Sequence, residues 1–343
     1  MIRVETVGEL RSAVEGARVE GKRVALVPTM GALHAGHLAL VRRAHEHVAS
    51  DGRGFVVVSI FVNPMQFAPH EDYESYPRDL SGDEAAVSRL GAAAPDLVYA
   101  PSVSEMYPQP ALTTVSVAEL SRRLEGTARP GHFDGVCLVV SKLFNQVGPD
   151  AAFFGRKDYQ QLQIIRRMVA DLDLPVEVVD VPTVRETDGL AISSRNVYLA
   201  GEDRRAARCV PRALAAAVCA ARTARAAEQA PEPDVLRRAA LATIRIEPRA
   251  RVDYVEVADP DTLAPPDEGC GEVSSGPGGA RGSAAPLREP SASPTAPQRG
   301  PVPARERCLL LVAVAVRIGQ TRLIDNVVVG DLEDERLLLE ATS

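Results

Sequence analysis

The chain has 343 residues, 45% of them hydrophobic and 25% charged, and its formal net charge is -7. A chain of this length usually divides into more than one core, and an acidic balance argues against nucleic acid as a partner. No apolar run is long enough to span a membrane, and the five cysteines include no C-x-x-C pair. These features favour a cytoplasmic protein with reduced thiols and no membrane partner.

The first half of the chain alternates short apolar runs with helical patterns. The helical patterns cover residues 38–49 and 158–172, and the apolar runs predict strands at 24–28, 55–62, 97–100, 151–154 and 176–181. Strands this apolar are typical of a parallel sheet that helices cover on both faces. We therefore expect an α/β fold, with a Rossmann-like, doubly wound parallel sheet that ends near residue 182.

The second half of the chain predicts a smaller α+β C-terminal domain. An Ala/Arg-rich helical stretch covers about 203–229, and strand-like runs follow at 251–259 and 308–329. This pattern places the two domains at residues 1–182 and 183–343.

A segment of different composition separates those two strand-like runs. Residues 264–303 are rich in Pro and Gly and contain no aromatic residue. Because so little apolar surface cannot offset the entropy of ordering the chain, we predict a disordered insertion there.

Two of the six histidines lie three positions apart, directly after the first predicted strand. The segment is MGALHAGH, Met30–His37, and a helix that begins near Leu33 would place His34 and His37 on its buried stripe. Both rings would then overhang the carboxyl edge of the sheet, where open α/β sheets bind ligands. A helix N-terminus beside two glycines suits phosphate, so the segment predicts a nucleotide site whose imidazoles donate to the α-phosphate.

Taken alone, the histidine pair also fits two plainer interpretations. It could be half of a metal site, although the spacing supplies no third ligand. It could equally be two core histidines whose ring nitrogens bond to backbone carbonyls. The motif by itself leaves both open.

The segment MGALHAGH resembles the H-x-G-H signature of the nucleotidylyltransferase and class I aminoacyl-tRNA synthetase superfamily. Three further stretches narrow the resemblance to the pantothenate synthetase family: FVNPMQF (61–67), FFGRKDYQQLQIIRRMV (153–169) and VPTVRETDGLAISSRNVYL (181–199). The similarity resumes at RIGQTRLIDN (317–326). It implies an ATP-dependent ligase of the coenzyme A pathway that joins pantoate to β-alanine through pantoyl adenylate and releases pyrophosphate and AMP.

The resemblance also implies roles for individual residues. It makes His37 the proton donor, with His34 and Lys157 as its catalytic companions on the nucleotide phosphates. Gln66 and Gln161 match the pair that binds the small substrates, pantoate and β-alanine. The ATP-binding set is Met30, Gly31, Ala32, Leu33, His34, Ala35, Gly36, His37, Gly155, Arg156, Lys157, Asp158, Val184, Ile192, Ser193, Ser194 and Arg195.

The chemistry of these side chains agrees with that assignment. Lys157 follows a strand end and can reach phosphate as a point charge, while Asp158 either accepts from the ribose or caps a helix. A neutral glutamine amide can donate to a carboxylate and accept from a hydroxyl. Ser194 and Arg195 offer donors to the β- and γ-phosphates, although a plain surface turn is the alternative.

The remaining expectations concern the surroundings of the site. Mg²⁺ should accompany ATP, held mainly by phosphates and water, with Asp83 a weak candidate ligand and the metal ligands otherwise unknown. His132 either lines the substrate pocket or braces its loop, and bracing is favoured. Family resemblance alone implies a homodimer. A hinge is expected near 182–188, because the serine-arginine loop must close over ATP.

Two other functions stay open at this point. Another H-x-G-H nucleotidylyltransferase would share the histidine motif but would not need paired glutamines for a carboxylate. A catalytically silent nucleotide-binding regulator would keep the fold without turnover, although it has less need of donors aimed at phosphate charge. Pantoate-dependent exchange between ATP and pyrophosphate separates the ligase from both.

Overall fold

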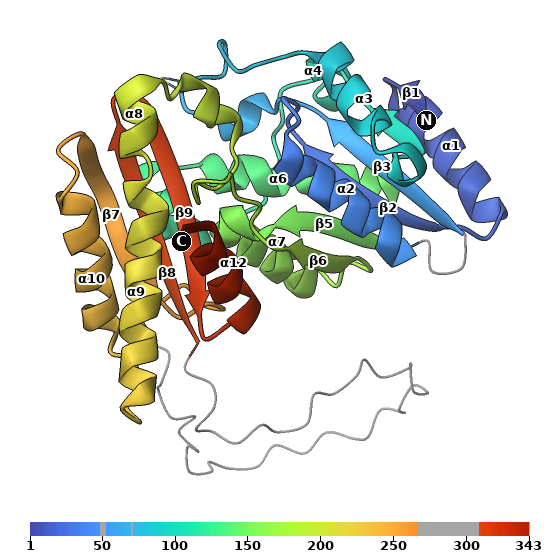
Figure 1. Cartoon of the computed structure of the whole chain (residues 1–343). Coiled ribbons are helices and arrows are strands. Elements are labelled where there is room, and N and C mark those ends of the chain that lie inside the picture. Colours follow the sequence, from blue (N-terminus) through green and yellow to red (C-terminus); the bar gives the residue numbers. More distant parts are fainter. Residues whose placement is uncertain (49–52, 70, 267–308, 343) are drawn as a thin grey trace, which may run out of the picture.

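The computed structural model describes residues 1–48, 53–69, 71–266 and 309–342. Two sheets organise these residues (Figure 1). The larger sheet is parallel and has the order β1-β4-β3-β2-β5-β6, with β1 (Ile2–Val4), β2 (Arg23–Thr29), β3 (Gly54–Ile60), β4 (Leu97–Tyr99), β5 (Ala151–Gly155) and β6 (Glu177–Val181). The smaller sheet is antiparallel and consists of β7 (Ala250–Ala258), β8 (Leu310–Ile318) and β9 (Thr321–Val329).

Helices cover both faces of the parallel sheet. Successive residues of β2 point to opposite faces, so Val24 and Leu26 join one core cluster while Ala25 and Val27 join another. The first cluster includes residues of α1 (Val7–Val19), α6 (His132–Val147) and α7 (Tyr159–Asp171), and the second includes α2 (Ala35–Val48). Shorter helices lie in the connections: α3 (Leu80–Ser88), α4 (Val103–Met106) and α5 (Glu125–Ala128). The prediction of a doubly wound parallel sheet is confirmed.

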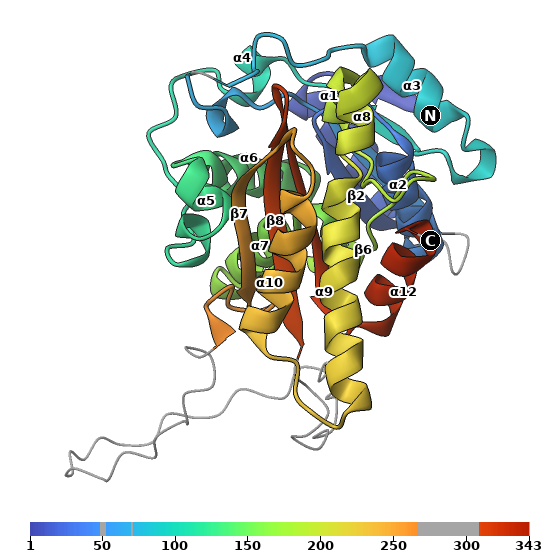
Figure 2. The same ribbon diagram turned by 60° about the vertical axis from the view of Figure 1, so that its left-hand side comes forward.

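One face of the antiparallel sheet packs against helices, and the other faces the parallel sheet and its helices. Val312 and Val314 of β8 pack in a core with α9 (Cys209–Ala226) and α10 (Pro233–Arg245), which lie across the sheet in Figure 2. On the opposite face, Leu311 and Ala313 belong to the core cluster that contains residues of α1, α6 and α7. The register of β7 on β8 runs from Ala250↔Ile318 to Ala258↔Leu311. Two more helices complete this half, α8 (Gly201–Ala206) and α12 (Leu332–Thr342).

The structure differs from the sequence prediction at several boundaries. The helical stretch expected at 203–229 is divided between α8 and α9, and the run at 308–329 forms two strands. Strand β1 and helix α12 were not predicted. Of the insertion expected at 264–303, residues 267–303 lie outside the described residues. No helix in the described part of the chain is long and apolar enough to cross a membrane.

The helix of the histidine motif also begins later than expected. Helix α2 starts at Ala35 rather than near Leu33. The reason is local: Ala32 has a left-handed φ of 50°, and the backbone N–H groups of Ala32 and Leu33 donate to the carboxylate of Asp83. His34 therefore lies just ahead of the helix instead of in its first turn.

Candidate functional site

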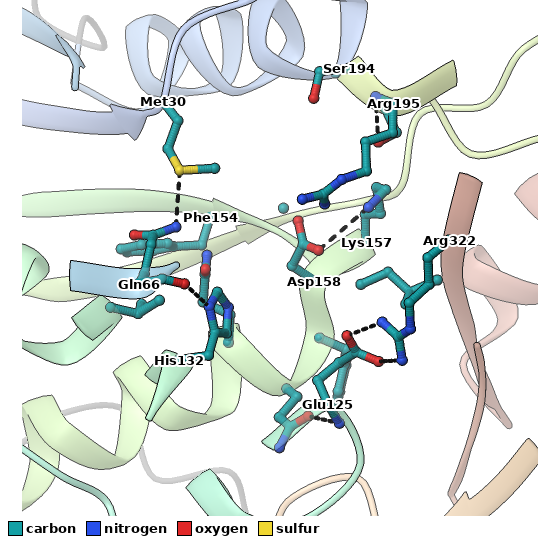
Figure 3. A pocket seen from close by; sticks show the side chains of 18 of the residues that line it. Met30, Gln66, Glu125, His132, Phe154, Lys157, Asp158, Ser194, Arg195 and Arg322 are labelled. Carbon is teal, nitrogen blue, oxygen red and sulfur yellow. Dashed lines mark hydrogen bonds and ion pairs between the residues drawn. The ribbon is translucent and has the colours of Figure 1, made fainter. Parts of the chain in front are cut away.

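A cavity of about 990 Å³ lies between the carboxyl edge of the parallel sheet and the antiparallel sheet (Figure 3). Its wall includes the ends of β2, β5 and β6 on one side and residues of all three antiparallel strands on the other. Carboxyl ends of parallel strands open into the space where such folds bind ligands. The fold therefore places the cavity where the sequence predicted a nucleotide.

Most of the predicted site residues line this one cavity. They come from four segments that are far apart in the sequence: Met30, His34, Gly36, His37, Gln66, Gly155, Lys157, Asp158, Gln161, Val184, Ile192, Ser193, Ser194 and Arg195. Figure 3 shows Met30, Ser194 and Arg195 along one side of the opening, with Lys157 and Asp158 between them and Glu125.

Five predicted nucleotide contacts do not lie on the cavity wall: Gly31, Ala32, Leu33, Ala35 and Arg156. The backbone N–H groups of Ala32 and Leu33 are already used by Asp83, so they are not free to bind phosphate. Arg156 turns toward Asp180 and Asp331 and forms ion pairs with both. Asp83, the weak candidate for magnesium, likewise has both oxygens on backbone donors and is absent from the wall.

The two imidazoles form a stacked pair. Their ring centroids are 4.0 Å apart, and the backbone N–H of His34 donates to Nδ1 of His37 over 3.3 Å. Accepting at Nδ1 leaves Nε2–H as the donor of a neutral His37. Gly36 makes room for the arrangement, since a Cβ there would lie 3.1 Å from the His34 ring.

Both imidazoles are neutral at physiological pH. Burial, with the neighbouring His34 ring as the next cause, lowers the pKa of His37 to about 3. Burial and then the charge of Lys157 lower the pKa of His34 to about 4. The rings therefore act as neutral hydrogen-bond donors, and positive charge in the cavity comes from Lys157 and from arginines such as Arg195.

The serine-arginine loop is held by a segment that the sequence analysis did not single out. Arg195 donates to both oxygens of Asp72, at 3.0 and 3.2 Å, and Ser194 Oγ lies 3.4 Å from the hydroxyl of Tyr76. The adjacent Glu71 is ion-paired with Arg129. All of these residues line the cavity, so two neighbouring carboxylates each hold one of its arginines.

Gln66 is fixed from several sides. Its side-chain Nε2 is 2.9 Å from the sulfur of Met30, and its Oε1 accepts from Asn63 Nδ2 over 3.1 Å. Its backbone carbonyl is 2.7 Å from Nδ1 of His132, whose pKa is lowered to about 4 by burial and by Arg129. His132 was expected either to brace the loop or to line the pocket. In the structure it does both.

Asn63 was missed, although it belongs to the motif FVNPMQF. Its side chain is only 1% exposed, and it also donates to the carbonyl of Gly135 and accepts from the hydroxyl of Tyr107. A polar amide directly before a proline, at the end of an apolar run, was the available signal.

An ion-paired cluster closes the far side of the cavity. Glu125 accepts from Arg322 of β9 with both oxygens, at 2.5 and 2.8 Å, and from the hydroxyl of Tyr254 of β7 at 2.9 Å. Figure 3 shows the paired Glu125 and Arg322 opposite Met30 and Ser194. No motif in the sequence indicated this cluster, because its members lie far apart along the chain.

Comparison with known proteins gives one consistent family. The sequence model of a family described as Pantoate-beta-alanine ligase matches residues 2–328. Pantothenate synthetase of Agrobacterium fabrum is 48% identical over 327 residues, which is 95% of each chain. That of Pelotomaculum thermopropionicum is 45% identical over 332 residues, covering 97% of this chain and 100% of its own.

Solved structures agree with the sequence relatives. A crystal structure of pantothenate synthetase from Thermus thermophilus has a TM-score of 0.74 at 43% identity and covers 96% of this chain and 99% of its own. A structure of pantoate-beta-alanine ligase from Francisella tularensis, complexed with beta-gamma ATP and beta-alanine, has a TM-score of 0.65 at 26% identity, with 96% and 97% covered. The residues that the family model matches, 2–328, include every residue of the cavity wall.

Proposed function

This chain belongs to the pantoate–β-alanine ligase family, and on that premise we propose that it uses ATP to condense pantoate with β-alanine through a pantoyl adenylate bound in the cavity. The observation that carries the proposal is the convergence of the histidine pair, Lys157 and the serine-arginine loop on one space. The two other functions considered from the sequence are not favoured, because the matches extend over nearly the whole chain.

In the first step the pantoate carboxylate attacks the α-phosphate of ATP, and pyrophosphate leaves. Negative charge grows on the phosphate oxygens, and donors that are already in place stabilise it. His37 and His34 supply neutral N–H donors, and Lys157 supplies a full positive charge. Arg195, with Ser193 and Ser194, receives the β- and γ-phosphates and exchanges part of its bonding to Asp72 for them.

Gln66 and Gln161 bind pantoate in this scheme, and their amides match its carboxylate and hydroxyl groups. Asn63 keeps Gln66 in one orientation. In the second step the uncharged amine of β-alanine attacks the acyl carbon, AMP leaves and the amine loses a proton. No covalent bond to the protein is required.

Mg²⁺ accompanies ATP in the proposal. Among the described residues no group of three His, Cys, Asp or Glu side chains could hold a metal ion, and the cavity carboxylates Asp72 and Glu71 are committed to arginines. This donor set fits magnesium held by triphosphate oxygens and water, which is its usual mode with nucleotides.

We also propose that the protein is a cytoplasmic homodimer of the coenzyme A pathway, in which the dimer and the pathway rest on the family resemblance. Its two units are 1–182 and 183–343, joined at a hinge near 182–188. Light scattering on purified protein tests the dimer. Crystals grown with and without nucleotide test the hinge, and identical angles between the two sheets would remove it.

Exchange of labelled pyrophosphate into ATP tests the main proposal. We expect exchange only when pantoate is present, and AMP release only when β-alanine is added as well. Exchange with no carboxylate, or with a different carboxylate in preference to pantoate, would contradict it. Saturable ATP binding without any exchange would favour the regulator.

A further inference from the structure

Two adjacent residues of β9 are almost fully buried although both are polar. Asp325 is 2% exposed and Asn326 is 6% exposed. Their side chains point to opposite faces of the antiparallel sheet, because Asn326 pairs with Ala313 of the cavity-side core and Asp325 with Val314 of the helix-side core. Buried polar groups are costly unless they are bonded, so the bonds they make indicate what they are for.

Asn326 holds the turn that carries Lys157. Its side-chain amide donates to the carbonyl of Arg156 over 3.1 Å and to the carbonyl of Lys157 over 2.7 Å. The turn belongs to the parallel sheet, since it directly follows β5. One side chain of the second sheet therefore fixes the backbone from which the phosphate-binding lysine extends.

Asp325 holds the segment of the chain that leads into the serine-arginine loop. Both of its oxygens accept from the Arg185 guanidinium, at 2.6 and 3.1 Å, and that arginine also donates to the carbonyl of Gly189. Arg185 forms a β-bridge with Ala191 in a short hairpin.

The hairpin ends in residues of the cavity wall. The backbone N–H of Ile192 donates to the carbonyl of Val184 over 3.0 Å, and both residues line the cavity. The chain then continues directly into Ser193, Ser194 and Arg195.

We propose that Asp325 and Asn326 are a positioning pair for ATP: Asn326 fixes the Lys157 turn, and Asp325, through Arg185, fixes the hairpin that leads into the serine-arginine loop. Because the two residues are consecutive in one strand, they set the distance between the lysine and the loop. This inference rests on the proposed function. Both residues lie on the cavity wall, but their side chains bond to Arg185 and to the backbone of the Lys157 turn. They act through those groups, and a displacement of about 1 Å in a phosphate-binding group can cost about a hundredfold in rate.

The chemistry at Asn326 explains why an amide is required. Two consecutive carbonyl oxygens need an NH₂ group with two hydrogens, which an asparagine has and an aspartate lacks. Asn326→Asp has nearly the same shape but presents an oxygen to two carbonyls, and Asn326→Ser retains one donor at most. The loss of rate should therefore be larger for Asn326→Asp than for Asn326→Ser.

The chain contains a matched control. Gln160 also donates from one amide to two backbone carbonyls, those of Leu120 and Arg123, both over 2.7 Å. These two carbonyls belong to a turn at residues 120–123, which does not carry Lys157. Gln160 lines the same cavity, so Gln160→Glu breaks an equivalent double contact at a different turn and measures the cost of losing such a contact.

The test is a double-mutant cycle with Lys157→Met, read by pantoate-dependent pyrophosphate exchange. We expect Asn326→Asp to lower the exchange rate about 10- to 100-fold in the parent chain and less than about threefold in the Lys157→Met background. The loss for Gln160→Glu should be the same in both backgrounds. Asp325→Asn should raise the KM for ATP at least as much as it lowers kcat.

Thermal melting of each variant identifies those that are folded at the assay temperature. Equal losses in both backgrounds for Asn326→Asp and Asn326→Ser would overturn the inference. A fall in melting temperature with unchanged exchange, or unfolding of both Asn326 variants, would also overturn it, since the role would then be structural. Absence of exchange in the parent protein would instead contradict the proposed function.

Discussion

Single side chains in the cavity are kept uncharged where charge would be expected to help. His34 and His37 have pKa values of about 4 and about 3 because burial disfavours the imidazolium form. A neutral ring can donate through one nitrogen while it accepts through the other, which a protonated ring cannot do. The histidines thus contribute directional bonds, and Lys157 contributes the charge.

Removal of His37 should therefore slow adenylation without unfolding the protein. We expect His37→Ala to reduce pantoate-dependent pyrophosphate exchange by a factor of about 100 to 1,000, the usual loss for one preorganised donor. His45, in the last turn of the same helix, is the matched control, and His45→Ala should keep the parent rate. An exchange rate near that of the parent in His37→Ala would remove the assigned role.

The lowered pKa values also predict how stability depends on pH. His34, His37 and His132 bind protons near pH 6.5 when the chain is unfolded but only near pH 3 to 4 when it is folded. The unfolded state therefore takes up more protons, and the free energy of unfolding should fall as the pH drops from about 6.5 toward 4.

Two buried carboxyl groups, Asp334 and Asp83, have pKa values raised by burial and oppose that trend. Burial raises the pKa of Asp334 to about 6, so this group stabilises the folded state as the pH falls through the same window. Three histidines outweigh the two carboxyl groups, and urea unfolding between about pH 7 and pH 4.5 should show the net decline. His132→Asn should flatten the curve, whereas an unchanged slope would mean that His132 is not buried as a neutral ring.

Among the elements, helix α6 sets the position of Gln66, a proposed substrate-binding residue, through one glycine. A Cβ at Gly135 would lie 2.1 Å from the carbonyl oxygen of Met65 and 2.7 Å from the backbone nitrogen of Gln66. The 3-10 turn that contains these residues, Pro64–Gln66, therefore rests directly on the helix backbone.

Gly135→Ala should consequently displace that turn. We expect a stability loss of about 1 to 3 kcal/mol from overpacking, and a raised KM for pantoate because Gln66 moves. Gly16→Ala in α1 is the control, since nothing lies within 4 Å of its added methyl group. That variant should be slightly more stable than the parent. Unchanged pantoate kinetics in Gly135→Ala would show that Gln66 does not depend on this contact.

The strands and helices also show which parts of the fold could be predicted from the sequence. The central strands were predicted because burial on both faces makes them apolar throughout, as in β2 and β3. Strand β1 was missed because it has three residues at the edge of the sheet, and Ile2 is half exposed. The helical residues of α2 were predicted, but its start depends on Asp83, a partner that no local pattern reveals.

The same distinction holds for the candidate site. His34, His37 and Lys157 follow strand ends within short motifs, so the sequence could place them together. The partners that hold the site, such as Asp72 for Arg195, are separated from it by 123 residues, and Arg322 is 197 residues from Glu125. Pairings of that kind depend on the docking of the two sheets, which local spacing does not encode.

At the scale of the whole molecule, Glu125 and Arg322 connect the two sheets. Glu125 is 7% exposed and lies among donors of the antiparallel sheet. After Glu125→Gln the Arg322 guanidinium keeps its ion pair with Asp253, so we expect a loss of about 1 to 3 kcal/mol from the weakened charged hydrogen bonds. Adding Arg322→Met should recover part of that loss. Chemical denaturation measures both.

The exposed pair Arg336 and Glu340 provides the comparison. Glu340→Gln should change stability by less than about 1 kcal/mol. If Glu125→Gln were equally mild, the cluster could not be what keeps the two sheets docked.

The pairing of β7 with β8 has a consequence for how this molecule can vary. Ala258 and Leu311 are opposite each other in the ladder, although a long stretch of chain lies between them. Because the exit and the return of the chain are already neighbours, doubling the length of the link adds only about 0.6 kcal/mol of closure entropy. Relatives can therefore gain or lose chain at this point without altering the catalytic architecture, and an experimenter can graft a reporter there for the same reason.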